Sequence, residues 1–565
     1  MRQSGAKRRD DNRDDITGAL YLNDAILIDR SIERIKVNNK AVNLRDIHYK
    51  LREKKRNIDK YKSRFGFGLK SDEHYFAYMI STETGQSAEE AGQRLEKVCR
   101  YSGIDPVDYY ENGLYRLSET RSLKEAKVLT DREKRRNRII KRICNGTGMG
   151  PEDILYDIGR LNIPLDDYYF YGVYNAKDED AAKRMEKIQR INDLKEKIKN
   201  DTYALTKIPD ESKKDIEEIY DLTRSILSKE RKAELAGKKA IESGDHEAEE
   251  AAVDIHLMRQ IWGFYPTEYK MFGFRGMPLE SRLSFVSTSM KNDVLNAVSP
   301  KEACDVLDNK YLTYRRLADL YGREMVLYDG SNIGELLDFA ASKSAFVKKS
   351  PFDAMGKGIS LVRLPDDPEE KRKEIIALAE ESFSADGEFL AEELIEAHES
   401  IRMLNPDSVN TVRICTYNDN GHVRVHDSFA KVGRSGSFVD NGGAGGIFVH
   451  IDALTGQMDS DGIDEKCSRY PEHPDNGLVF RDYAFPEWDK ALEVSRKAAE
   501  KVPELAYVGW DLTYTKDEKW IIVEGNARTQ FLGQQATTGK GTLLSFAEVL
   551  GGTEELRKYN RSSKQ

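Results

Sequence analysis

Two β-rich runs separated by a short polar segment constrain the fold of this chain more than any other feature. Residues 507–515 read YVGWDLTYT, residues 520–526 read WIIVEGN, and the four residues between them are KDEK. Runs of aromatic and β-branched residues on either side of a polar turn predict a β-hairpin. From about Val306 onward, short apolar runs alternate with glycine-rich turns and with helical stretches at 368–382 and 487–501, which is typical of a mixed α/β domain.

The predicted hairpin brings two carboxylates together. With the turn centred in the middle of KDEK, Asp511 lies opposite Glu524, and Asn526 shares the face of Glu524 because strand side chains repeat every two residues. Like charges directly opposite one another destabilise a sheet, and a hard cation between them removes the conflict. Two carboxylates and an amide oxygen suit magnesium. The alternative is a hairpin whose acids point into solvent, although its many apolar residues favour a buried ribbon.

Length and charge restrict the class of protein. At about 150 residues per domain, the 565 residues allow three or four domains. The charged fraction of 33% is high and the hydrophobic fraction of 39% is low, which indicates solvated helices as well as a packed core. A net charge of −9 on a chain of this length argues against a nucleic-acid partner.

The sequence contains no pattern typical of export or of a membrane span. Its five cysteines are widely spread and show no CxxC or Cys/His spacing, so we expect neither a disulfide framework nor a zinc site. The first residues are charged rather than apolar, and the longest apolar stretches, such as 19–28, are too short to cross a bilayer. We therefore expect a cytoplasmic protein without a signal peptide or a membrane span.

A short motif recurs three times in the N-terminal half. It consists of an acid, a tyrosine, three further residues and a glycine, with a proline two or three positions before the acid, and its copies begin at Pro106, Pro164 and Pro266. Each copy predicts a Pro-containing turn followed by a short aromatic helix that a glycine caps. A unit this small must stack on its neighbours, so we interpret the aromatic residues as packing residues rather than as a ligand platform.

The rest of the N-terminal half predicts charged helices. Residues 178–252 are rich in Lys, Glu, Ala and Ile and predict two long helices, 181–203 and 213–244, which form a solvated hairpin or a docking surface. The predicted divisions of the chain are a polar, basic-leaning arm with a charged helix, a helical repeat region, the helical hairpin, the mixed α/β domain and a tail, at residues 1–65, 66–180, 181–258, 259–552 and 553–565.

Lysines and glycines after a short strand indicate phosphate binding. A predicted strand ends at Lys348 and Lys349, and Gly356, Lys357 and Gly358 follow in a loop. Glycines let backbone N–H groups close on a phosphate, and lysines supply positive charge. The segment is not a Walker loop, because the pattern GxxxxGK[ST] is absent.

Three further segments supply candidate residues. Residues 388–395 form an apolar strand that runs into acids and can offer backbone groups to a nucleotide base, unless it is an ordinary strand end. On the strand 408–416, Asn410 and Arg413 lie on opposite faces unless the strand is bulged. Burial of Arg413 among apolar residues is costly unless it meets an anion. The glycine-rich loop 440–446 either lets the backbone approach a ligand closely or serves as a structural turn.

Taken in order, these segments resemble the ATP-grasp superfamily, and specifically its sugar-transfer-associated family. The resemblance covers roughly residues 262–552 and depends on SVNTVRICT from Ser408, DNGGAGGIFVHIDALTG from Asp440, YVGWDLTYT from Tyr507 and IIVEGNAR from Ile521, with support from Lys348 and from His473-Pro474. It implies an α+β fold in which two α+β subdomains surround the nucleotide. A mostly α-helical N-terminal region with short helical repeats precedes this fold.

The resemblance also implies ATP and Mg²⁺ as cofactors and assigns roles to the candidate residues. The expected magnesium ligands are Asp511, Glu524 and Asn526. The expected contacts to the ATP phosphates are Lys348 or Lys349 together with the loop residues Gly356, Lys357 and Gly358. The expected contacts to adenine and ribose are Glu392, Glu393, Leu394, Ile395 and, for the ribose, Glu399. Superfamily members often have Lys-Pro where this chain has two lysines, which leaves open which lysine contacts phosphate.

The activity that the resemblance implies is ATP-dependent ligation. A carboxylate becomes an acyl phosphate that an amine or a similar nucleophile attacks, with Arg413, Asn410 and Lys357 as the expected catalytic residues. We expect a small molecule or a glycan or peptide precursor as substrate, as in polysaccharide biosynthesis at the cell surface. The alternatives are an ATP-dependent phosphotransferase and a nucleotide-binding interaction protein whose N-terminal helices bind a protein partner.

Overall fold

The computed structural model describes residues 72–352, 358–419, 421–440 and 442–562, which form two compact units divided between Tyr169 and Phe170. The arm and the charged helix predicted for residues 1–65 lie outside the described residues. The other domain boundaries inferred from the sequence stay predictions. None of the described helices combines the length and the apolar character that a bilayer crossing needs.

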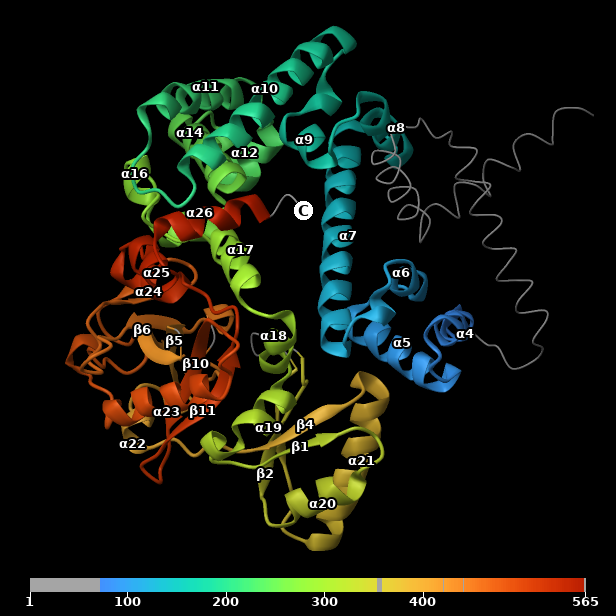
Figure 1. Ribbon diagram of the computed structural model, residues 1–565, viewed down its shortest axis with the longest axis vertical. Helices are drawn as coiled ribbons and strands as arrows, with labels where there is room; N and C mark the ends of the chain where they lie inside the picture. Colours follow the sequence, from blue (N-terminus) through green and yellow to red (C-terminus); the bar gives the residue numbers. More distant parts are fainter. Residues whose placement is uncertain (1–71, 353–357, 420, 441, 563–565) are drawn as a thin grey trace, which may run out of the picture. The chain divides into compact units, whose positions relative to one another are not determined.

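The first unit is helical, with the long helix α7 beside several shorter ones (Figure 1). Its elements are α4 (Asp72–Thr84), α5 (Ala88–Ser102), α6 (Pro106–Glu111), η2 (Leu114–Arg116), α7 (Glu119–Thr147), α8 (Pro151–Leu161) and the start of α9 (Leu165–Phe170). Helix α5 begins at a capping box, in which Ser87 Oγ accepts from Glu90 N and Ser87 N donates to the Glu90 carboxylate. It packs against α4 and α7.

The repeated motif forms the expected structure at all three positions. A short helix begins at or next to each motif proline, as α6, α9 and α15 (Pro266–Met271). The motif glycines Gly113, Gly172 and Gly273 have φ values of 66°, 61° and 67°, a left-handed conformation that favours glycine at a helix end. The motif tyrosines are at most 4% exposed: Tyr109, Tyr168 and Tyr269. The interpretation of the aromatic residues as packing residues is therefore confirmed.

The second unit begins with helices that depart from the prediction in one place. Helix α10 (Asp178–Thr202) matches the first expected helix, but three helices replace the single one expected over 213–244: α11 (Asp210–Ile226), α12 (Lys229–Ala236) and α13 (Lys238–Glu242). Ser228 interrupts that helix because its Oγ accepts from Arg231 N and so starts α12. Gly237, at φ 102°, separates α12 from α13. The single long helix was thus a wrong prediction.

Further helices lead from this part to the sheets. Helix α14 (His246–Trp262) packs on α10, α11 and α12. The short elements of this region are η3 (Val173–Asn175), α15, α16 (Leu279–Arg282), α17 (Thr288–Val298), α18 (Lys301–Asp308) and α19 (Lys310–Tyr321). Helix α19 packs against strands of both sheets.

The smaller sheet is antiparallel and has the strand order β1-β4-β2-β3. Its strands are β1 (Met325–Tyr328), β2 (Ala345–Lys349), β3 (Ser360–Arg363) and β4 (Phe389–Glu393). Helices α20 (Ile333–Ala341) and α21 (Pro368–Asp386) pack on the sheet (Figure 1), where Leu336 and Ile375 meet Phe346 and Phe389. Helix α21 matches the expected stretch 368–382 and is four residues longer.

The larger sheet has the order β11-β10-β5-β6-β7-β8-β9 and is also antiparallel. Its strands are β5 (Thr411–Asp419), β6 (His422–Val432), β7 (Ile447–His450), β8 (Gly462–Ile463), β9 (Arg469–Tyr470), β10 (Tyr507–Tyr514) and β11 (Trp520–Asn526). Helix α23 (Trp488–Glu500) packs on β5, β6, β10 and β11 and matches the expected stretch 487–501. The remaining helices and turns are α22 (Glu399–Arg402), η4 (Gly442–Ala444), η5 (Phe480–Asp482), α24 (Leu532–Thr538), α25 (Leu543–Val549) and α26 (Thr553–Ser562).

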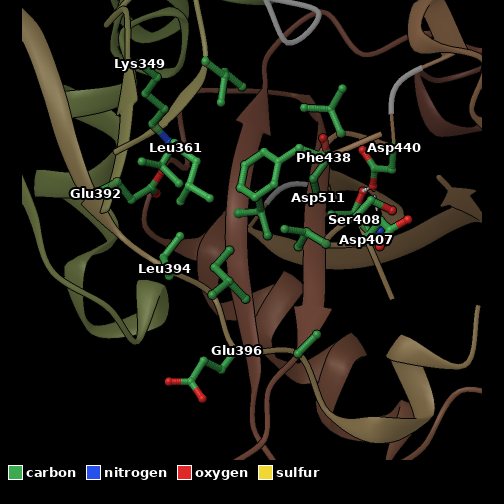
Figure 2. A pocket seen from close by; sticks show the side chains of 18 of the residues that line it. Lys349, Leu361, Glu392, Leu394, Glu396, Asp407, Ser408, Phe438, Asp440 and Asp511 are labelled. Carbon is green, nitrogen blue, oxygen red and sulfur yellow. Dashed lines mark hydrogen bonds and ion pairs between the residues drawn. The ribbon is translucent and has the colours of Figure 1, made fainter. Parts of the chain in front are cut away.

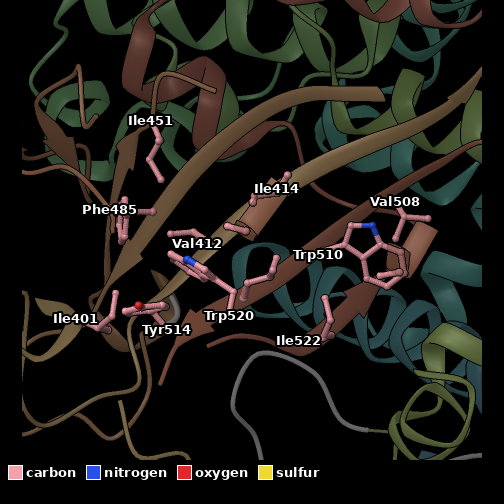
Figure 3. Packing of buried hydrophobic residues seen from close by; sticks show 14 of the residues in the cluster. Ile401, Val412, Ile414, Ile451, Phe485, Val508, Trp510, Tyr514, Trp520 and Ile522 are labelled. Atoms are coloured by element: carbon pink, nitrogen blue, oxygen red, sulfur yellow. The ribbon is translucent and has the colours of Figure 1, made fainter. Parts of the chain in front are cut away.

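A continuous apolar core holds the larger sheet. Figure 3 shows Trp510, Ile414 and Ile522 on neighbouring strands of this core. Trp510 is fully buried, and its indole Nε1 donates to Thr416 Oγ1 at 2.9 Å, so the ring is packed and its one polar atom has a partner. The observed α+β architecture agrees with the fold class predicted from the sequence.

We expect Tyr269→Phe to lower the free energy of unfolding by about 1–2 kcal/mol. The Tyr269 hydroxyl donates to Asp254 Oδ2 at 2.5 Å, in a network that also includes Tyr220 and Arg282. Tyr265→Phe is the control, because Tyr265 is 41% exposed. Thermal unfolding monitored by circular dichroism measures both variants, and equal unfolding temperatures would contradict the prediction.

Candidate functional site

The turn of the hairpin between β10 and β11 is centred on Asp517, whereas the sequence predicted a centre between Asp517 and Glu518. Thr515 N donates to Lys519 O at 2.9 Å, so the loop contains three residues and is centred on Asp517. Its last residue, Glu518, has a φ of 57°, which is usual for the third residue of such a loop. The expected hairpin is confirmed, but the expected centre of its turn is wrong.

A β-bulge compensates for this difference. A hairpin centred on Asp517 would place Val523 opposite Asp511, and Glu524 would then point to the other face of the sheet. In the structure, Leu512 pairs with Ile522 while Asp511 pairs with Glu524, so Val523 is the extra residue of the bulge. The predicted pairing of the two carboxylates therefore forms, because the bulge shifts the register by one residue.

Asp511 is a buried anion held by two cations. The residue is 2% exposed, and Arg413 from β5 donates to its carboxylate twice, from Nε to Oδ1 at 2.7 Å and from Nη2 to Oδ2 at 2.6 Å. Lys431 from β6 donates to Oδ2 at 2.9 Å. Burial alone would raise the pKa of Asp511, but the charges of Arg413 and Lys431 outweigh it and lower this pKa to about 2. The anion that buried Arg413 needs is thus Asp511.

A cavity of about 580 Å³ lies beside this carboxylate, between residues of the two sheets. Figure 2 shows Lys349, Leu361 and Glu392 of the smaller sheet on one side and Asp511 and Asp440 on the other. Glu524 also lines the cavity, and its side chain is 37% exposed. The paired carboxylates therefore face a space that can hold a ligand.

The structure separates the two adjacent lysines of β2. Lys349 lines the cavity, where it forms an ion pair with Glu392. Lys348 does not line it: its Nζ donates to Ser382 Oγ at 2.9 Å and lies 5.7 Å from the centre of the Phe389 ring. Because strand side chains alternate, only one of the two lysines can point into the cavity. Of the two lysines between which the sequence left the choice open, Lys349 is therefore the one that faces the cavity.

Residues at the end of β4 line the cavity as the sequence led us to expect. Glu392, Glu393, Leu394 and Ile395 are all among the lining residues. Burial raises the pKa of Glu392, but the charges of Arg323 and Lys349 outweigh it and lower this pKa. Glu392 therefore carries a negative charge inside the cavity.

The glycine loop is only partly described. Gly358 has a φ of 69° and is exposed, and the next residue, Ile359, lines the cavity. Gly356 and Lys357 lie outside the described residues, so their expected contacts stay predictions. The loop returns to the cavity wall through Leu361 on β3.

Three further expected site residues lie outside the cavity lining. Asn410 is buried, and its amide donates to Asn405 O and accepts from Gly433 N, so it joins two loops instead of facing a ligand. Glu399 begins α22, is exposed and does not line the cavity, whereas Glu396 and Asp407 on either side of it in sequence do. These positions argue against a catalytic Asn410 and a ribose-binding Glu399. Arg413 is also outside the cavity lining, because Asp511 occupies its guanidinium.

The donor set around the carboxylates fits a magnesium ion. Asp511 and Glu524 line one cavity from facing positions, and Asn526 follows on the same face of β11. The amide Nδ2 of Asn526 is buried without a hydrogen-bond partner. Asn526 does not itself line the cavity, so the two carboxylates are the oxygen donors that face it, and the amide oxygen of Asn526 on the same face of β11 would add a third donor of the kind that suits Mg²⁺. Within the described residues, no three His, Cys, Asp or Glu side chains form such a group, so the set depends on Asn526.

Several cationic residues of the site were missed in the sequence, and among them Arg363, Arg402 and Lys516 line the cavity. Lys431 lines the cavity, and a lysine within the apolar end of β6 was the same kind of pattern that singled out Arg413. Lys310, at the start of α19, lines the cavity with its Nζ 3.6 Å from Glu524 Oε1. Arg323 is buried beside Glu392. Nothing in the local sequence marks Lys310 or Arg323, because their partners are about 70 to 215 residues away.

A comparison with protein families matches residues 289–549 to the family described as sugar-transfer associated ATP-grasp. The matched segment is slightly less than half of the chain, and it contains both sheets and the cavity. The resemblance inferred from the sequence motifs is thereby confirmed. A comparison with curated proteins finds no match.

Similar solved structures include the ATP-grasp ligase PsnB complexed with a minimal precursor, at 16% identity over 42% of this chain and 57% of that chain, with a TM-score of 0.25. The N5-carboxyaminoimidazole ribonucleotide synthetase purK in its ADP complex has 14% identity over 40% of this chain and 47% of that chain, with a TM-score of 0.26. D-alanine-D-alanine ligase from Coxiella burnetii has 10% identity over 49% of this chain and 67% of that chain, with a TM-score of 0.28. The chain spans about half the length of the first two.

The buried ion pairs of Asp511 predict an acid-dependent loss of stability. Because the pKa of Asp511 is about 2 in the folded protein and 3.8 ordinarily, its contribution is present above pH 4 and is lost as the pH falls toward 2. We expect the difference in unfolding free energy between wild type and Asp511→Asn to shrink by about 2 kcal/mol between pH 5 and pH 2. Urea denaturation at several pH values measures this, with Asp517→Asn in the turn as control. A difference that does not depend on pH would contradict the prediction.

Proposed function

We propose that residues 289–549, which belong to the sugar-transfer associated ATP-grasp family, bind Mg-ATP and use it to join a carboxylate to an amine or a similar nucleophile. The observation that carries this proposal is the pairing of Asp511 with Glu524 across the hairpin, with both side chains on one cavity. Arg413 and Lys431 offset the charge of Asp511, and Lys310 lies 3.6 Å from Glu524, but a divalent cation between the facing carboxylates would remove the repulsion that remains. Mg²⁺ accompanied by a triphosphate supplies that cation.

The positive groups around the cavity support binding of a triphosphate. Lys349, Lys310 and Lys431 reach the cavity from three different elements, β2, α19 and β6. Lysines on several sides of a ligand suit a triphosphate, because its negatively charged oxygens point in several directions. The strand end from Glu393 to Ile395 supplies backbone groups and apolar side chains to the cavity wall, which suits a nucleobase.

The proposed reaction has two steps. A substrate carboxylate oxygen attacks the γ-phosphorus of ATP and ADP leaves, and an amine then attacks the carbonyl carbon so that an amide forms and phosphate leaves. Mg²⁺, when bound, would supply positive charge that offsets the charge developing on the phosphate oxygens. The residues of this chain would hold the reactants: Lys349, Lys310 and Lys431 would orient the phosphates, and the carboxylates of Asp511 and Glu524 would hold the metal. No protein nucleophile is needed.

The substrate class is proposed from the family description alone. Because the family is described as associated with sugar transfer, we propose a glycan or peptide precursor of a cell-surface polymer as the carboxylate or the nucleophile. Mass spectrometry of the product distinguishes an amide from a phosphorylated hydroxyl, which a phosphotransferase would form instead.

Replacing Glu524 by Gln is expected to reduce ADP release by about a hundredfold or more, because it removes one charged metal ligand. The assay follows ADP release by the full-length protein over a panel of carboxylates and amines in the presence of Mg²⁺. Glu518→Gln is the matched control, since Glu518 lies in the turn of the same hairpin, away from the cavity. Full activity of Glu524→Gln would exclude the proposed metal site.

A second comparison uses the two neighbouring lysines of β2. We expect Lys349→Met to weaken ATP binding by about tenfold or more, because it removes a positive charge from the cavity. Lys348→Met should leave the affinity within about threefold, since Lys348 contacts Ser382 outside the cavity. Isothermal titration calorimetry with Mg-ATP measures both, and a greater effect of Lys348→Met would refute the assignment.

A further inference from the structure

Arg323 joins the two sheets at the cavity from a loop between α19 and β1. Its guanidinium is buried and forms five hydrogen bonds. On the side of the smaller sheet, Nε and Nη2 donate to Glu392 Oε1 at 2.9 and 2.6 Å. On the side of the larger sheet, Nη1 donates to Ile522 O at 2.7 Å and Nη2 lies 3.4 Å from Val523 O. Nη1 also donates to Tyr321 O at 2.9 Å, so all three nitrogens have partners.

Two of the three carbonyls that Arg323 contacts belong to the β-bulge. Ile522 is the last residue of the normal register, and Val523 is the extra residue that shifts Glu524 onto the face of Asp511. Strand β11 is the edge of the larger sheet, so its outward carbonyls have no neighbouring strand to bond with. A bulge at an edge needs such a partner to stay in one register, and Arg323 supplies it.

Through its hydrogen bonds to Glu392, the guanidinium also changes the net charge of the cavity wall. Glu392 Oε1 accepts from Arg323, and Glu392 Oε2 forms the ion pair with Lys349. The group therefore contains two cations and one carboxylate and keeps one net positive charge. Without Arg323, Glu392 would neutralise Lys349, and the cavity would attract phosphate less strongly.

We infer that Arg323 is a positioning residue for Mg-ATP: it holds the bulge that places Glu524 opposite Asp511, and it shares Glu392, so that Glu392 does not cancel the charge of Lys349 and the group keeps one positive charge that attracts phosphate. This inference depends on the proposed binding of Mg-ATP. It assigns Arg323 two separable effects, one on metal-dependent binding through β11 and one on metal-independent binding through Glu392. A residue that merely stabilised the fold would lower both affinities together.

The test measures the affinity of the full-length protein for ATP by calorimetry, with Mg²⁺ and with EDTA. Arg323→Lys keeps the positive charge beside Glu392 but has no fork that spans both sheets. We expect its affinity for ATP in EDTA to stay within about threefold of wild type. The factor by which Mg²⁺ raises its affinity for ATP, here called the gain from Mg²⁺, should fall by about tenfold. Arg323→Met also loses the charge, so its affinity in EDTA should fall by about tenfold.

A double variant and a control make the test specific. Arg323→Met combined with Glu392→Gln restores one net positive charge, so its affinity in EDTA should recover while the gain from Mg²⁺ stays low. Arg316→Met is the control, because Arg316 on α19 is exposed and donates to Lys501 O outside the cavity.

The outcomes separate this inference from the proposed function. Wild type that does not bind Mg-ATP refutes the proposed function and, with it, the inference. If the wild type binds Mg-ATP and Arg323→Lys keeps the full gain from Mg²⁺, the inference is refuted while the proposed function stands. Thermal unfolding of each variant shows whether it folds, and if Arg323→Met does not fold, Arg323→Lys decides the result.

Discussion

The buried charge of Asp511 is the interaction on which the site depends. A carboxylate that is removed from water is stable only beside cations, and Asp511 has Arg413 and Lys431 within hydrogen-bond distance. These contacts join β10 to β5 and to β6, so the electrostatic requirement of one residue also aligns three strands. The same two cations reduce the repulsion that Asp511 exerts on Glu524, which lets the two carboxylates face each other.

The charges of the cavity are arranged in pairs, and this arrangement explains why metal and nucleotide would bind together. Glu392 is paired with Lys349 and Arg323, Asp511 with Lys431 and Arg413, and Glu524 lies near Lys310. A triphosphate that bound without a metal ion would be attracted by the lysines but repelled by the carboxylates. A divalent cation changes that balance, because it gives the carboxylates and the phosphate oxygens a shared partner.

The N-terminal half shows how packing requirements appear in a sequence. The motif tyrosines are buried wherever the motif occurs, and the hydroxyls of Tyr168 and Tyr269 donate to Asp157 and Asp254. A partner stabilises a buried tyrosine hydroxyl, and for these two tyrosines an acid eleven or fifteen residues earlier supplies it, whereas the buried hydroxyl of Tyr109 has no hydrogen-bond partner among the described residues. The proline and the glycine of the motif set the local turn, and these requirements do not depend on distant residues.

Local patterns in the sequence were sufficient for most of the helices, for the existence of the hairpin and for the motif glycines with positive φ, and they placed Glu524 and Asn526 on one face of β11. They also identified Arg413 as a residue that needs an anion. Each of these depends on neighbours in the chain or on the alternation of side chains within one strand. The tertiary structure decided the remainder: that Lys349 and not Lys348 faces the cavity, that a bulge at Val523 restores the register, and that Arg323 and Lys310 reach the site. In a strand, a shift of one residue exchanges the two faces, and only the pairing with distant strands determines which face is buried.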